Sequence, residues 1–580
     1  MTAAAVFFAA GLVFMTYWPH LVAVWSSGAF FDTDDAMRLV QVRALIQGQS
    51  WFDMTVYPLD PPAGSFMHWS RVVDIPLVLL IKSFGLFTDT ATAERLARLV
   101  FPLALLFALF AGVARLADVL LGSIARIPAI VATLLSGSAT FQFQPGRIDH
   151  HAPQIVLLVF MVASALDALD PRLARRAGTA GALAALSLAI GLENLPFIAC
   201  LWACLVAAWV WQGATMAGTL RWFAAGFGTA LVVFFAATVG PQRWFEPACD
   251  SLGMAHLGAG LIGSVGCAAM TFCGTALDTR GRRCAAAIIV AAAAALFVAT
   301  AYPACLHDPF AGVDPLVREI WINHVTESLP FSEVWRQRRI MALLLLMPVL
   351  LGFAGAMAAA LIVHARTGLR FLLLALLIAV GLAGSFWQIR VFASVTPLAV
   401  CGALPVAVWL HDRLRRAGRD LLSILALCLV FPFTSAAWAL ALPEERVALV
   451  GAGTCLTPAA LAPIAALPAG RVLAPIDAGP YILAHTGMSV FAAPYHRNND
   501  GNRFALHAFL AAPAPARAML DARQVDYVAV CPGLPETAGL AQHQRDSLAA
   551  ALTQGSPPPW LVQVPLTGTP VRLFRVARRP

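Results

Sequence analysis

The chain has 580 residues, of which 60% are hydrophobic and only 12% are charged. A mean hydropathy of +0.76 excludes an ordinary soluble protein and indicates a polytopic membrane protein. The formal net charge is +8, but arginines in short cytoplasmic loops produce such an excess without any nucleic acid as a partner.

Thirteen hydrophobic runs are predicted to form membrane helices. They occupy residues 3–24, 95–117, 124–140, 152–169, 177–192, 195–212, 222–240, 256–276, 284–303, 340–363, 371–389, 391–410 and 421–441. The first run is uncharged and is not followed by a small-residue cleavage pattern, so it is predicted to be retained rather than removed as a signal peptide. A further stretch, Val72–Thr88, is short and carries Asp74 and Lys82. It is predicted to lie at the membrane interface without crossing.

Every second connection between these runs is rich in arginine, as at 172–176, 280–283 and 413–419. By the positive-inside rule these connections are cytoplasmic. The alternate connections, and everything after about residue 442, are therefore predicted to lie outside.

The C-terminal part has a different pattern. Short buried strands are predicted at 471–476, 489–492 and 525–530, helices at 481–486, 503–523 and 537–554, and a closing hairpin at 561–564 and 571–576. Strands that alternate with helices are typical of a compact α/β domain. The predicted organisation is thus a transmembrane domain at 1–441 with large external loops at 26–94 and 304–338, followed by an extracytoplasmic α/β domain at 442–580.

Eleven cysteines are scattered without a CxxC pair, and most lie in apolar runs, where Cys behaves as a small hydrophobe. Cys455 and Cys531 lie in the polar C-terminal part; they either pair in an oxidising compartment or remain free thiols. Abundant Ala and Arg with few Lys are typical of a GC-rich bacterial source. That source predicts a bacterial inner membrane with the C-terminal domain in the periplasm.

An acidic turn, Asp32, Asp34 and Asp35, directly follows the first hydrophobic run. Carboxylates so close together repel one another, and they become favourable when a divalent cation or a bound cationic group holds them. The simpler interpretation is a solvated loop just outside the membrane.

A second polar motif, Gly146 to His151, stands at the mouth of a span on the predicted outer side. It contains Arg147, Asp149 and His150. The carboxylate of Asp149 and the imidazole of His151 form a mixed ligand set compatible with Mn²⁺ or Mg²⁺. The simpler interpretation is a helix cap with two interfacial histidines.

Two more charged residues fall on the same predicted face. Glu327 lies in the long loop before the span at 340–363, where a lone glutamate is usually just solvated. Arg390 lies at the outer end of an apolar run, where its guanidinium suits phosphate oxygens or simply snorkels to the interface. The agreement of all four features on one face is stronger evidence than any one of them.

In this order the motifs resemble those of the GT-C superfamily of polyprenyl-phosphate-dependent glycosyltransferases. The nearest likeness is to the catalytic subunit of oligosaccharyltransferase, including its archaeal and bacterial single-subunit forms. Asp32–Asp35 resembles the family's first acidic motif and Gly146–His151 its Gly-x-x-Asp-His-His motif. Val325–Glu327 resembles its Ser-Val-Ser-Glu or Thr-Ile-x-Glu motif, and Arg390–Pro397 its arginine before an apolar stretch that ends in Pro. The likeness spans most of the chain.

One family motif is missing. Where the family carries Trp-Trp-Asp-Tyr-Gly, which reads the glycosylation sequon, this chain has Pro475–Tyr481 and neither tryptophan. A polar cluster with His496 and Arg497 follows it. The departure disfavours an Asn-x-Ser/Thr protein as the acceptor.

The resemblance implies transfer of a sugar or an oligosaccharide from a polyprenyl-phosphate or pyrophosphate donor to an envelope lipid, polysaccharide or protein. It implies a divalent cation, Mn²⁺ or Mg²⁺, on Asp34, Asp149 and His151, and Arg390 at the donor phosphate. A catalytic carboxylate, Asp34 or Glu327, would orient or deprotonate the acceptor. The remaining candidate site residues are Asp32, Asp35, Arg147, His150, His496 and Arg497. His68, Arg71 and Glu193 also fall on the outer face, where an anchoring role is the simpler interpretation.

Two rival functions remain open. A transporter or a flippase for lipid-linked sugars would explain the many spans, but transporters place ionisable groups near the bilayer midplane and often contain repeats. A sensor or assembly protein would leave the carboxylate–histidine motifs unexplained. The sugar, the number of donor phosphates and the acceptor class are not decided by the residues.

Overall fold

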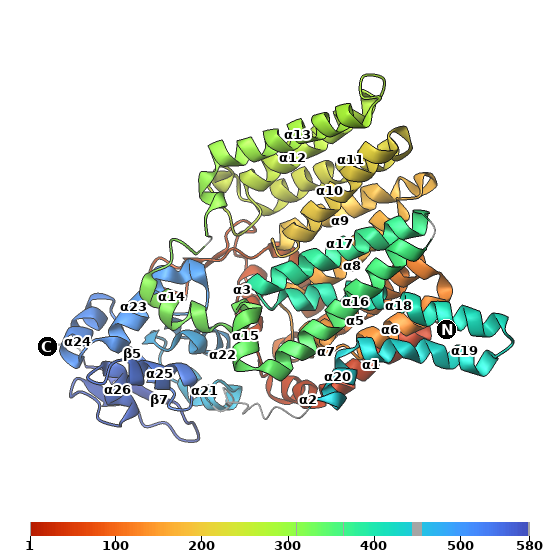
Figure 1. Ribbon diagram of the computed structural model, residues 1–580. Helices are drawn as coiled ribbons and strands as arrows, with labels where there is room; N and C mark the ends of the chain where they lie inside the picture. The colour runs from red at the N-terminus through yellow and green to blue at the C-terminus, as the bar shows by residue number, and fades with distance from the viewer. Residues whose placement is uncertain (1, 309, 364, 443–454, 578–580) are drawn as a thin grey trace.

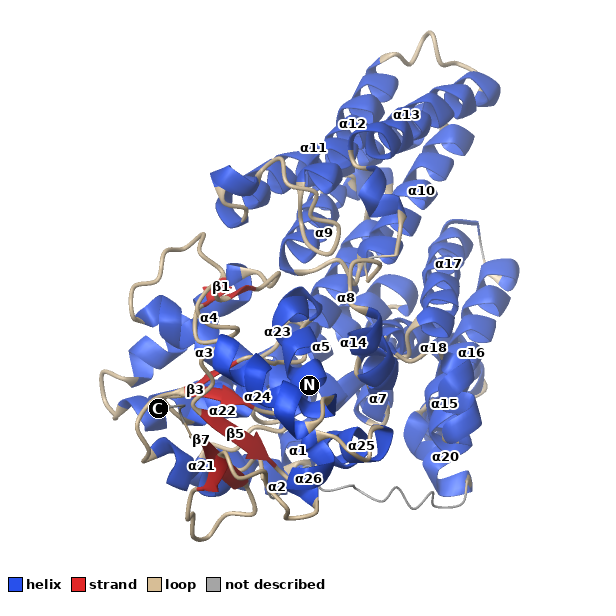
Figure 2. Ribbon diagram, turned by 90° about the vertical axis from the view of Figure 1, so that its left-hand side faces the viewer, coloured by secondary structure: helices blue, strands red, loops and turns tan. Residues whose placement is uncertain are grey.

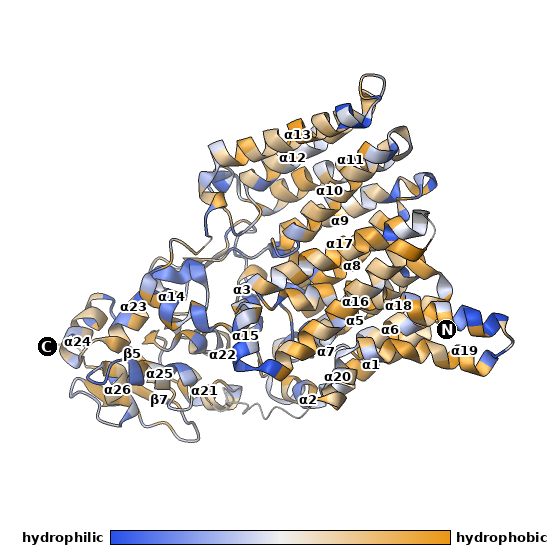
Figure 3. Cartoon of the chain, viewed as in Figure 1, coloured by the Kyte–Doolittle hydropathy of each residue, from blue (hydrophilic) through white to orange (hydrophobic). Residues whose placement is uncertain are grey.

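A computed structural model describes residues 2–308, 310–363, 365–442 and 455–577. Figure 1 shows a bundle of long helices that run roughly side by side, with an α/β unit, in blue, at one end. Apolar residues dominate along the bundle helices in Figure 3, and hydrophilic residues gather at the helix ends and in the connections toward the α/β unit. This is the distribution of a membrane bundle whose helices end in polar layers.

The long helices follow the predicted hydrophobic runs. Among the described residues, eight are long and apolar enough to cross a membrane: α5 (Thr90–Leu121), α10 (Leu195–Gln212), α11 (Ala214–Thr238), α12 (Met254–Phe272), α13 (Arg280–Ala301), α16 (Arg339–Ile362), α17 (Ala365–Trp387) and α18 (Val391–Arg416). Three bent pairs would raise the number to 11: α1 (Thr2–Thr16) with α2 (Trp18–Ser27), α6 (Arg126–Leu134) with α7 (Gly137–Thr140), and α19 (Asp420–Ala426) with α20 (Ser435–Ala441). Two shorter apolar helices are α8 (His151–Asp167) and α9 (Arg176–Ile190). Every predicted hydrophobic run is therefore helical, and the polytopic fold is confirmed.

The stretch Val72–Thr88 forms α4 (Arg71–Phe84), which has 14 residues and is not among the helices that could cross a membrane. It packs beside α5 and against α3 (Thr33–Ile46). The short length and the charges at its two ends explain why it is not a candidate span.

Close helix contacts in the bundle depend on glycine. A methyl group at Gly352 of α16 would lie 2.3 Å from the carbonyl oxygen of Ala399 in α18, and one at Gly226 of α11 would lie 2.2 Å from the carbonyl oxygen of Gly178 in α9. Because apolar surface has no special drive to associate in lipid, membrane helices use such small residues to gain packing contact.

The acidic turn is held in place by helix α3. Asp32 caps this helix by accepting a hydrogen bond from the backbone N–H of Asp34 at 2.9 Å. One turn later, Arg38 is fully buried and pairs with Asp74 of α4 at 3.0 Å, and Arg71 pairs with the other oxygen of Asp74 at 3.1 Å. This buried triad fixes α3 on α4 and so fixes the direction of the acidic turn.

The C-terminal unit is the predicted α/β domain, with its strands in red in Figure 2. Its sheet has the order β4-β3-β5-β7-β6, with β3 (Arg471–Leu473), β4 (Ser489–Val490), β5 (Tyr527–Val530), β6 (Leu561–Gln563) and β7 (Arg572–Val576). Strand β3 pairs in parallel with β4 and β5, and β7 pairs antiparallel with β5 and β6. Its helices are α21 (Pro458–Ala465), α22 (Gly479–His485), α23 (Asn499–Leu510), α24 (Pro513–Ala522), α25 (Pro535–His543) and α26 (Leu548–Thr553).

Two helix predictions in this domain are wrong in detail. The single helix predicted at 503–523 is split, because α23 ends at Leu510 and a new helix starts at Pro513. Proline lacks an N–H and suits the first turn of a helix, not its middle. The helix predicted at 537–554 is likewise two helices, α25 and α26.

The α/β domain is attached to the loop between α3 and α4, which also carries β1 (Thr55–Val56) and β2 (Ser65–Phe66). The N–H of Val490 donates to the carbonyl of Pro58, and the N–H of Asp60 donates to the carbonyl of Val490, both at 2.8 Å. Arg523 pairs with the side chain of Asp60 at 3.1 Å. The predicted boundary at residue 442 adjoins residues 443–454, which lie outside the described part of the chain.

Two disulfides lie in segments assigned to the outer side. Cys455 forms a disulfide with Cys531, so of the two alternatives, a disulfide or two free thiols, the structure has the disulfide. The second bond, Cys249–Cys305, was not predicted. It links the loop before α12 to the segment after α13 and so joins neighbouring ends of these two helices.

Candidate functional site

A cleft of about 760 Å³ lies where the loops at one end of the bundle meet the α/β domain. Its lining comes from the acidic turn, the start of α8, the long loop around α14 (Pro315–Ile320), the turn between α17 and α18, and the C-terminal domain. The predicted site residues that line it are Asp32, Asp34, His150, His151, Glu327, Arg390 and His496. The structure thus brings segments hundreds of residues apart to one cleft.

The remaining predicted site residues, Asp35, Arg147, Asp149 and Arg497, are not part of the cleft lining. The guanidinium of Arg147 is 7% exposed and forms ion pairs with Asp32 and Asp149, and a longer one of 3.7 Å with Asp35. Asp35 also accepts the N–H of Ile148 at 2.7 Å. Arg147 therefore ties the second motif to the acidic turn and is occupied by protein carboxylates.

The carboxylates are crowded at Asp34. Its side chain forms no hydrogen bond or ion pair with the rest of the described chain. Burial, together with the negative charges of Asp32 and Asp149, raises the pKa of Asp34 well above its ordinary value. Burial also raises the pKa of Asp35 to about 7, even though Arg147 opposes the shift. A bound cation would relieve this repulsion, so the residues fit a divalent ion.

The compact ligand clusters are different from the predicted one. Among the described residues, two groups of three have ligand atoms that all lie within 4.8 Å of one another: His150 with His151 and Glu193, and His68 with Asp250 and His496. The predicted set of Asp34, Asp149 and His151 is not such a group. Its members interact electrostatically, and Asp149 accepts the backbone N–H of His151 at 3.0 Å. The metal assignment stays a prediction.

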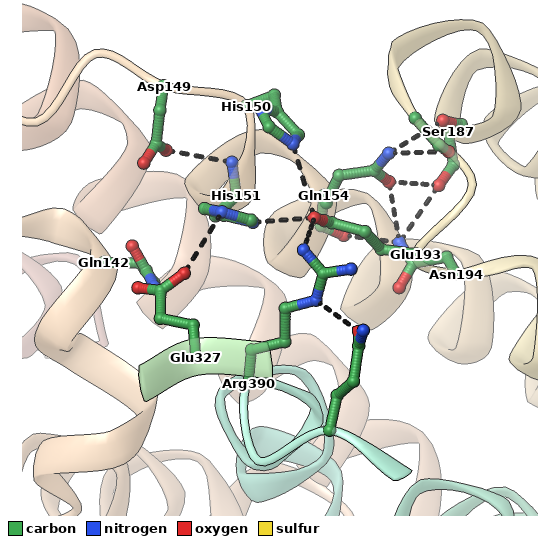
Figure 4. Close-up of polar contacts among 12 residues, drawn as sticks. Gln142, Asp149, His150, His151, Gln154, Ser187, Glu193, Asn194, Glu327 and Arg390 are labelled. Atoms are coloured by element: carbon green, nitrogen blue, oxygen red, sulfur yellow. Dashed lines mark hydrogen bonds and ion pairs between the residues drawn. The ribbon is translucent and has the colours of Figure 1, made fainter. Parts of the chain in front are cut away.

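Glu193, in the turn between α9 and α10, is the centre of the basic side of the site (Figure 4). Its Oε1 lies 2.8 Å from Nδ1 of His151, 3.3 Å from Nε2 of His150 and 3.8 Å from Nη1 of Arg390. Burial alone would raise the pKa of Glu193, but the two histidines hold it well below its ordinary value. Glu193 is therefore a carboxylate at neutral pH.

Buried amides fix the turn that carries Glu193. The side-chain amide of Gln154 donates to the carbonyls of Ser187 and Gly191, each at 2.9 Å. Asn194 in turn donates to the carbonyl and the side-chain oxygen of Gln154, each at 2.9 Å. Because these groups are buried and bonded to one another, the position of Glu193 is set by the fold.

Arg390 and Glu327 lie side by side in the cleft lining (Figure 4). Nε of Arg390 donates to the side-chain oxygen of Gln388 at 2.8 Å, and its backbone N–H donates to the carbonyl of Glu327 at 3.3 Å. Oε2 of Glu327 lies 3.8 Å from Nε2 of His151. The Arg390 and Glu327 side chains are 37% and 39% exposed, so both can reach a molecule in the cleft.

A second polar centre joins the α/β domain to the loop before α12. Asp250 accepts from Arg497 at 2.6 and 2.8 Å and lies 2.7 Å from Nε2 of His496. The ring of His68 lies 4.6 Å from that of His496. The guanidinium of Arg497 is paired with Asp250, whereas His68 and His496 line the cleft.

Sequence reasoning missed Asp250 and Glu536 and gave Glu193 only an anchoring role. Glu536 lines the cleft and accepts the N–H groups of Ile476 and Asp477 at 2.7 and 3.0 Å. The only sequence signal for Asp250 was its place beside Cys249 in an outer loop, and Glu536 had none.

Comparison with solved structures finds this fold in an archaeal oligosaccharyltransferase. The structure of AglB from Archaeoglobus fulgidus in complex with an inhibitory peptide and a dolichol-phosphate matches with a TM-score of 0.67 at 15% identity, over 100% of this chain and 74% of that one. The A. fulgidus enzyme in complex with Zn and sulfate gives a TM-score of 0.64 at 14% identity, over 100% and 73%.

A third structure, the same enzyme tethered through a disulfide bond to an acceptor peptide containing the NVT sequon, gives a TM-score of 0.64 at 16% identity, over 100% and 74%. At these identities the likeness establishes the fold alone, which is a polytopic helical bundle with a C-terminal α/β domain. No model of a known protein family matches the sequence, and neither does any curated protein sequence.

Proposed function

We propose that the chain is an integral-membrane glycosyltransferase. It transfers a sugar or an oligosaccharide from a polyprenyl-phosphate or pyrophosphate donor to an envelope acceptor on the extracytoplasmic face. The observation that carries this proposal is the single cleft in which Asp34, Glu327, His151 and Arg390 meet. The support from the fold is its likeness to AglB, which was solved with a dolichol-phosphate.

The basic side of the cleft suits the donor phosphate. Arg390 presents a partly exposed guanidinium that can form charge-assisted hydrogen bonds to phosphate oxygens, and His151 lies on the other side of Glu193. The fold holds these hydrogen-bonding groups in place before the lipid-linked sugar binds. They therefore stabilise the charge that develops on the leaving phosphate without having to reorganise. A divalent cation held by Asp34, Asp149 and His151 would add Lewis-acid stabilisation of that charge.

The acidic side suits the acceptor. As the attacking oxygen or nitrogen of the acceptor bonds to the anomeric carbon, the bond from that carbon to the phosphate oxygen breaks, and its electron pair leaves with the lipid phosphate. The acceptor proton passes to a carboxylate, for which Glu327 and Asp34 are the candidates because both line the cleft. The α/β domain, which contributes Asp477, Tyr495 and Glu536, covers the acceptor.

The part of the cleft lining that the α/β domain contributes supports an acceptor other than the sequon. The carboxyl group of Glu536 accepts hydrogen bonds from the backbone N–H groups of Ile476 and Asp477. This region also has no tryptophan pair that could contact the hydroxyl side chain of a sequon. An envelope lipid or polysaccharide is therefore the preferred acceptor. The two disulfides on the cleft side support an oxidising compartment, which would be the periplasm if the membrane is a bacterial inner membrane.

The test uses the purified full-length protein in nanodiscs with lipid-linked sugars extracted from its source membrane. Wild-type protein should release free polyprenyl phosphate or pyrophosphate when envelope glycan is added, and Asp34→Asn and Glu327→Gln should lower the rate at least about 100-fold. Glu333→Gln is the control, because Glu333 pairs with Arg336 outside the cleft. Equal rates for Asp34→Asn, Glu327→Gln and wild type would contradict the assigned roles.

A further inference from the structure

A small pocket of about 160 Å³ lies apart from the cleft, and the described linings of the two have no residue in common. It is bounded by the C-terminal end of α2, the beginning of α5, helix α3 and the end of α22 in the α/β domain. Ser27 and Ala91 are exposed members of its lining, so the pocket opens to the surface of the protein. The charged or titratable residues of the lining are Arg43, Glu94, Arg95, Arg98 and His485.

One positive charge in this pocket is already balanced. Glu94 accepts hydrogen bonds from Nε of Arg43 at 2.8 Å and from its Nη2 at 2.7 Å. Arg43 also donates to the backbone carbonyl of Ala484 at 2.6 Å. Because Glu94 is the only carboxylate in the described lining, this pair leaves no carboxylate in the pocket that could bind an ammonium group.

The other two arginines have only backbone carbonyls as hydrogen-bond partners among the described residues. Arg95 donates to the carbonyl of Trp25 at 3.1 Å. Arg98 donates to the carbonyl of Gly28 at 2.9 Å and to that of Ala29. These carbonyls lie at the C-terminal end of α2, where a helix carries roughly half a negative elementary charge. Two guanidinium charges therefore exceed the negative charge that the protein places beside them.

Arg98 is built into the protein and is not a mobile surface side chain. It is 2% exposed, its guanidinium carbon lies 3.8 Å from the centre of the Phe30 ring, and its Nε has no partner in the described chain. Nε2 of His485 is likewise buried and unpartnered there. Burial and the positive charges of Arg98 and Arg43 lower the pKa of His485 to about 4, so positive charge outweighs that of Glu94 at this histidine. Buried polar atoms without partners are expected where a ligand completes a site.

The pocket lies at the level of the lipid headgroups. Helix α5 has 32 residues, whereas about 20 residues suffice to cross the hydrocarbon core. The sequence between Arg98 and Arg115 carries no charge, so Arg98 marks one border of that core. Large exposed apolar side chains lie close to the lining residues in the chain, with Trp25 near the end of α2 and Leu86 and Phe87 just before α5. Such side chains are typical of a membrane–water interface.

We propose that this pocket binds the phosphate group of an anionic membrane lipid. Arg95 and Arg98 donate charge-assisted hydrogen bonds to the phosphate oxygens. A headgroup without an amine, such as that of phosphatidylglycerol, is preferred because Glu94 is taken by Arg43 and cannot pair with an ammonium group. The bound lipid joins α2 and α5 to α22 of the α/β domain. The pocket and the cleft are separate, so this site and the proposed function can fail independently.

The first measurement is native mass spectrometry of the full-length protein with lipids that have the same acyl chains. Phosphatidylglycerol and phosphatidylcholine are titrated separately, because both contain a phosphodiester but only phosphatidylglycerol has a net negative headgroup. Wild type should bind the first phosphatidylglycerol at least about tenfold more tightly than the first phosphatidylcholine, which is the scale of one charge-assisted contact. Equal affinities for the two lipids overturn the proposal.

Variants assign this preference to the pocket. Arg95→Gln and Arg98→Gln should each lower the preference for phosphatidylglycerol by about tenfold. Arg503→Gln is the matched control, because it also removes one positive charge, and Arg503 is 52% exposed, pairs with Asp500 and lies outside the pocket. If Arg98→Gln does not fold, Arg95→Gln decides, since Arg95 is only partly buried. A preference that is unchanged in Arg95→Gln, or that falls equally in Arg503→Gln, overturns the proposal.

Two further measurements on wild type locate the site and identify the source of the phosphate. Phosphatidylglycerol with a photoreactive headgroup should label peptides that contain residues 27–30 or 91–98, and labelling confined to other segments overturns the site. Phosphatidylglycerol added to delipidated protein should raise the melting temperature, and inorganic phosphate at the same concentration should not. The reverse result overturns the lipid and assigns the pocket to free phosphate.

Discussion

Arg147 holds the acidic turn and the second motif together, and its replacement gives a sharp test of that role. Arg147→Met replaces the guanidinium with a shorter, unbranched and uncharged side chain, which leaves Asp35 and Asp149, each about 1% exposed, without their shared partner. Removing one partner of a buried ion pair typically costs about 3–5 kcal/mol. Gln142, which also accepts from Arg147, would lose its bond as well.

The assay is thermal unfolding of the purified protein. Unfolding is monitored by the labelling of two buried thiols, Cys267 and Cys401, which become accessible when the bundle opens. Arg147→Met should unfold at a clearly lower temperature than wild type. Arg282→Met is the control, because Arg282 and Asp278 are 62% and 59% exposed and such a surface pair contributes about 0–1 kcal/mol. If Arg147→Met unfolds at the same temperature as the control variant, the guanidinium does not hold the site together.

Three further predictions concern stability. Burial and a neighbouring carboxylate raise the pKa of Glu536 from 4.5 to about 8, so the folded state prefers the protonated form. The stability of the protein should therefore fall as the pH rises from about 4.5 to about 8. Glu536→Gln should flatten that part of a profile of melting temperature against pH. Gly352→Ala should destabilise the bundle by about 1–3 kcal/mol through a backbone clash with α18, whereas Gly281→Ala, with open space around it, should not; thermal unfolding of both compares them. Breaking the Cys455–Cys531 bond by Cys531→Ser should cost about 2–4 kcal/mol, measured by the protease resistance of the C-terminal domain; unchanged resistance would contradict it.

Much of the architecture could be predicted because it depends on local patterns. Long apolar runs give helices wherever they occur, and the short charged stretch now seen as α4 fails as a span for the same reason. The alternation of strands and helices after residue 455 was likewise visible in the sequence. The split at Pro513 was readable too, since a proline seldom stands inside a helix.

The site could be predicted only in part, because the sequence shows which polar residues share a face and not which of them pair. Arg147 and Arg497 were candidate site residues, yet each is paired with a carboxylate from a distant segment, Arg147 with Asp32 and Arg497 with Asp250. Asp250 and Glu193 looked unremarkable because their partners come from the α/β domain and from the start of α8 and α18. Such pairings follow from the packing of whole elements, which no local pattern records.

The central claim is that this cleft transfers a sugar from a lipid phosphate. The most direct measurement is mass spectrometry of lipid-linked sugars and envelope glycans in source cells that carry wild-type protein, Asp34→Asn or no copy of the gene. One polyprenyl-linked sugar should accumulate and one envelope glycan should lose a residue, both without the gene and with Asp34→Asn. An unchanged lipid-linked pool with every glycan intact would contradict transfer and favour a transporter or flippase.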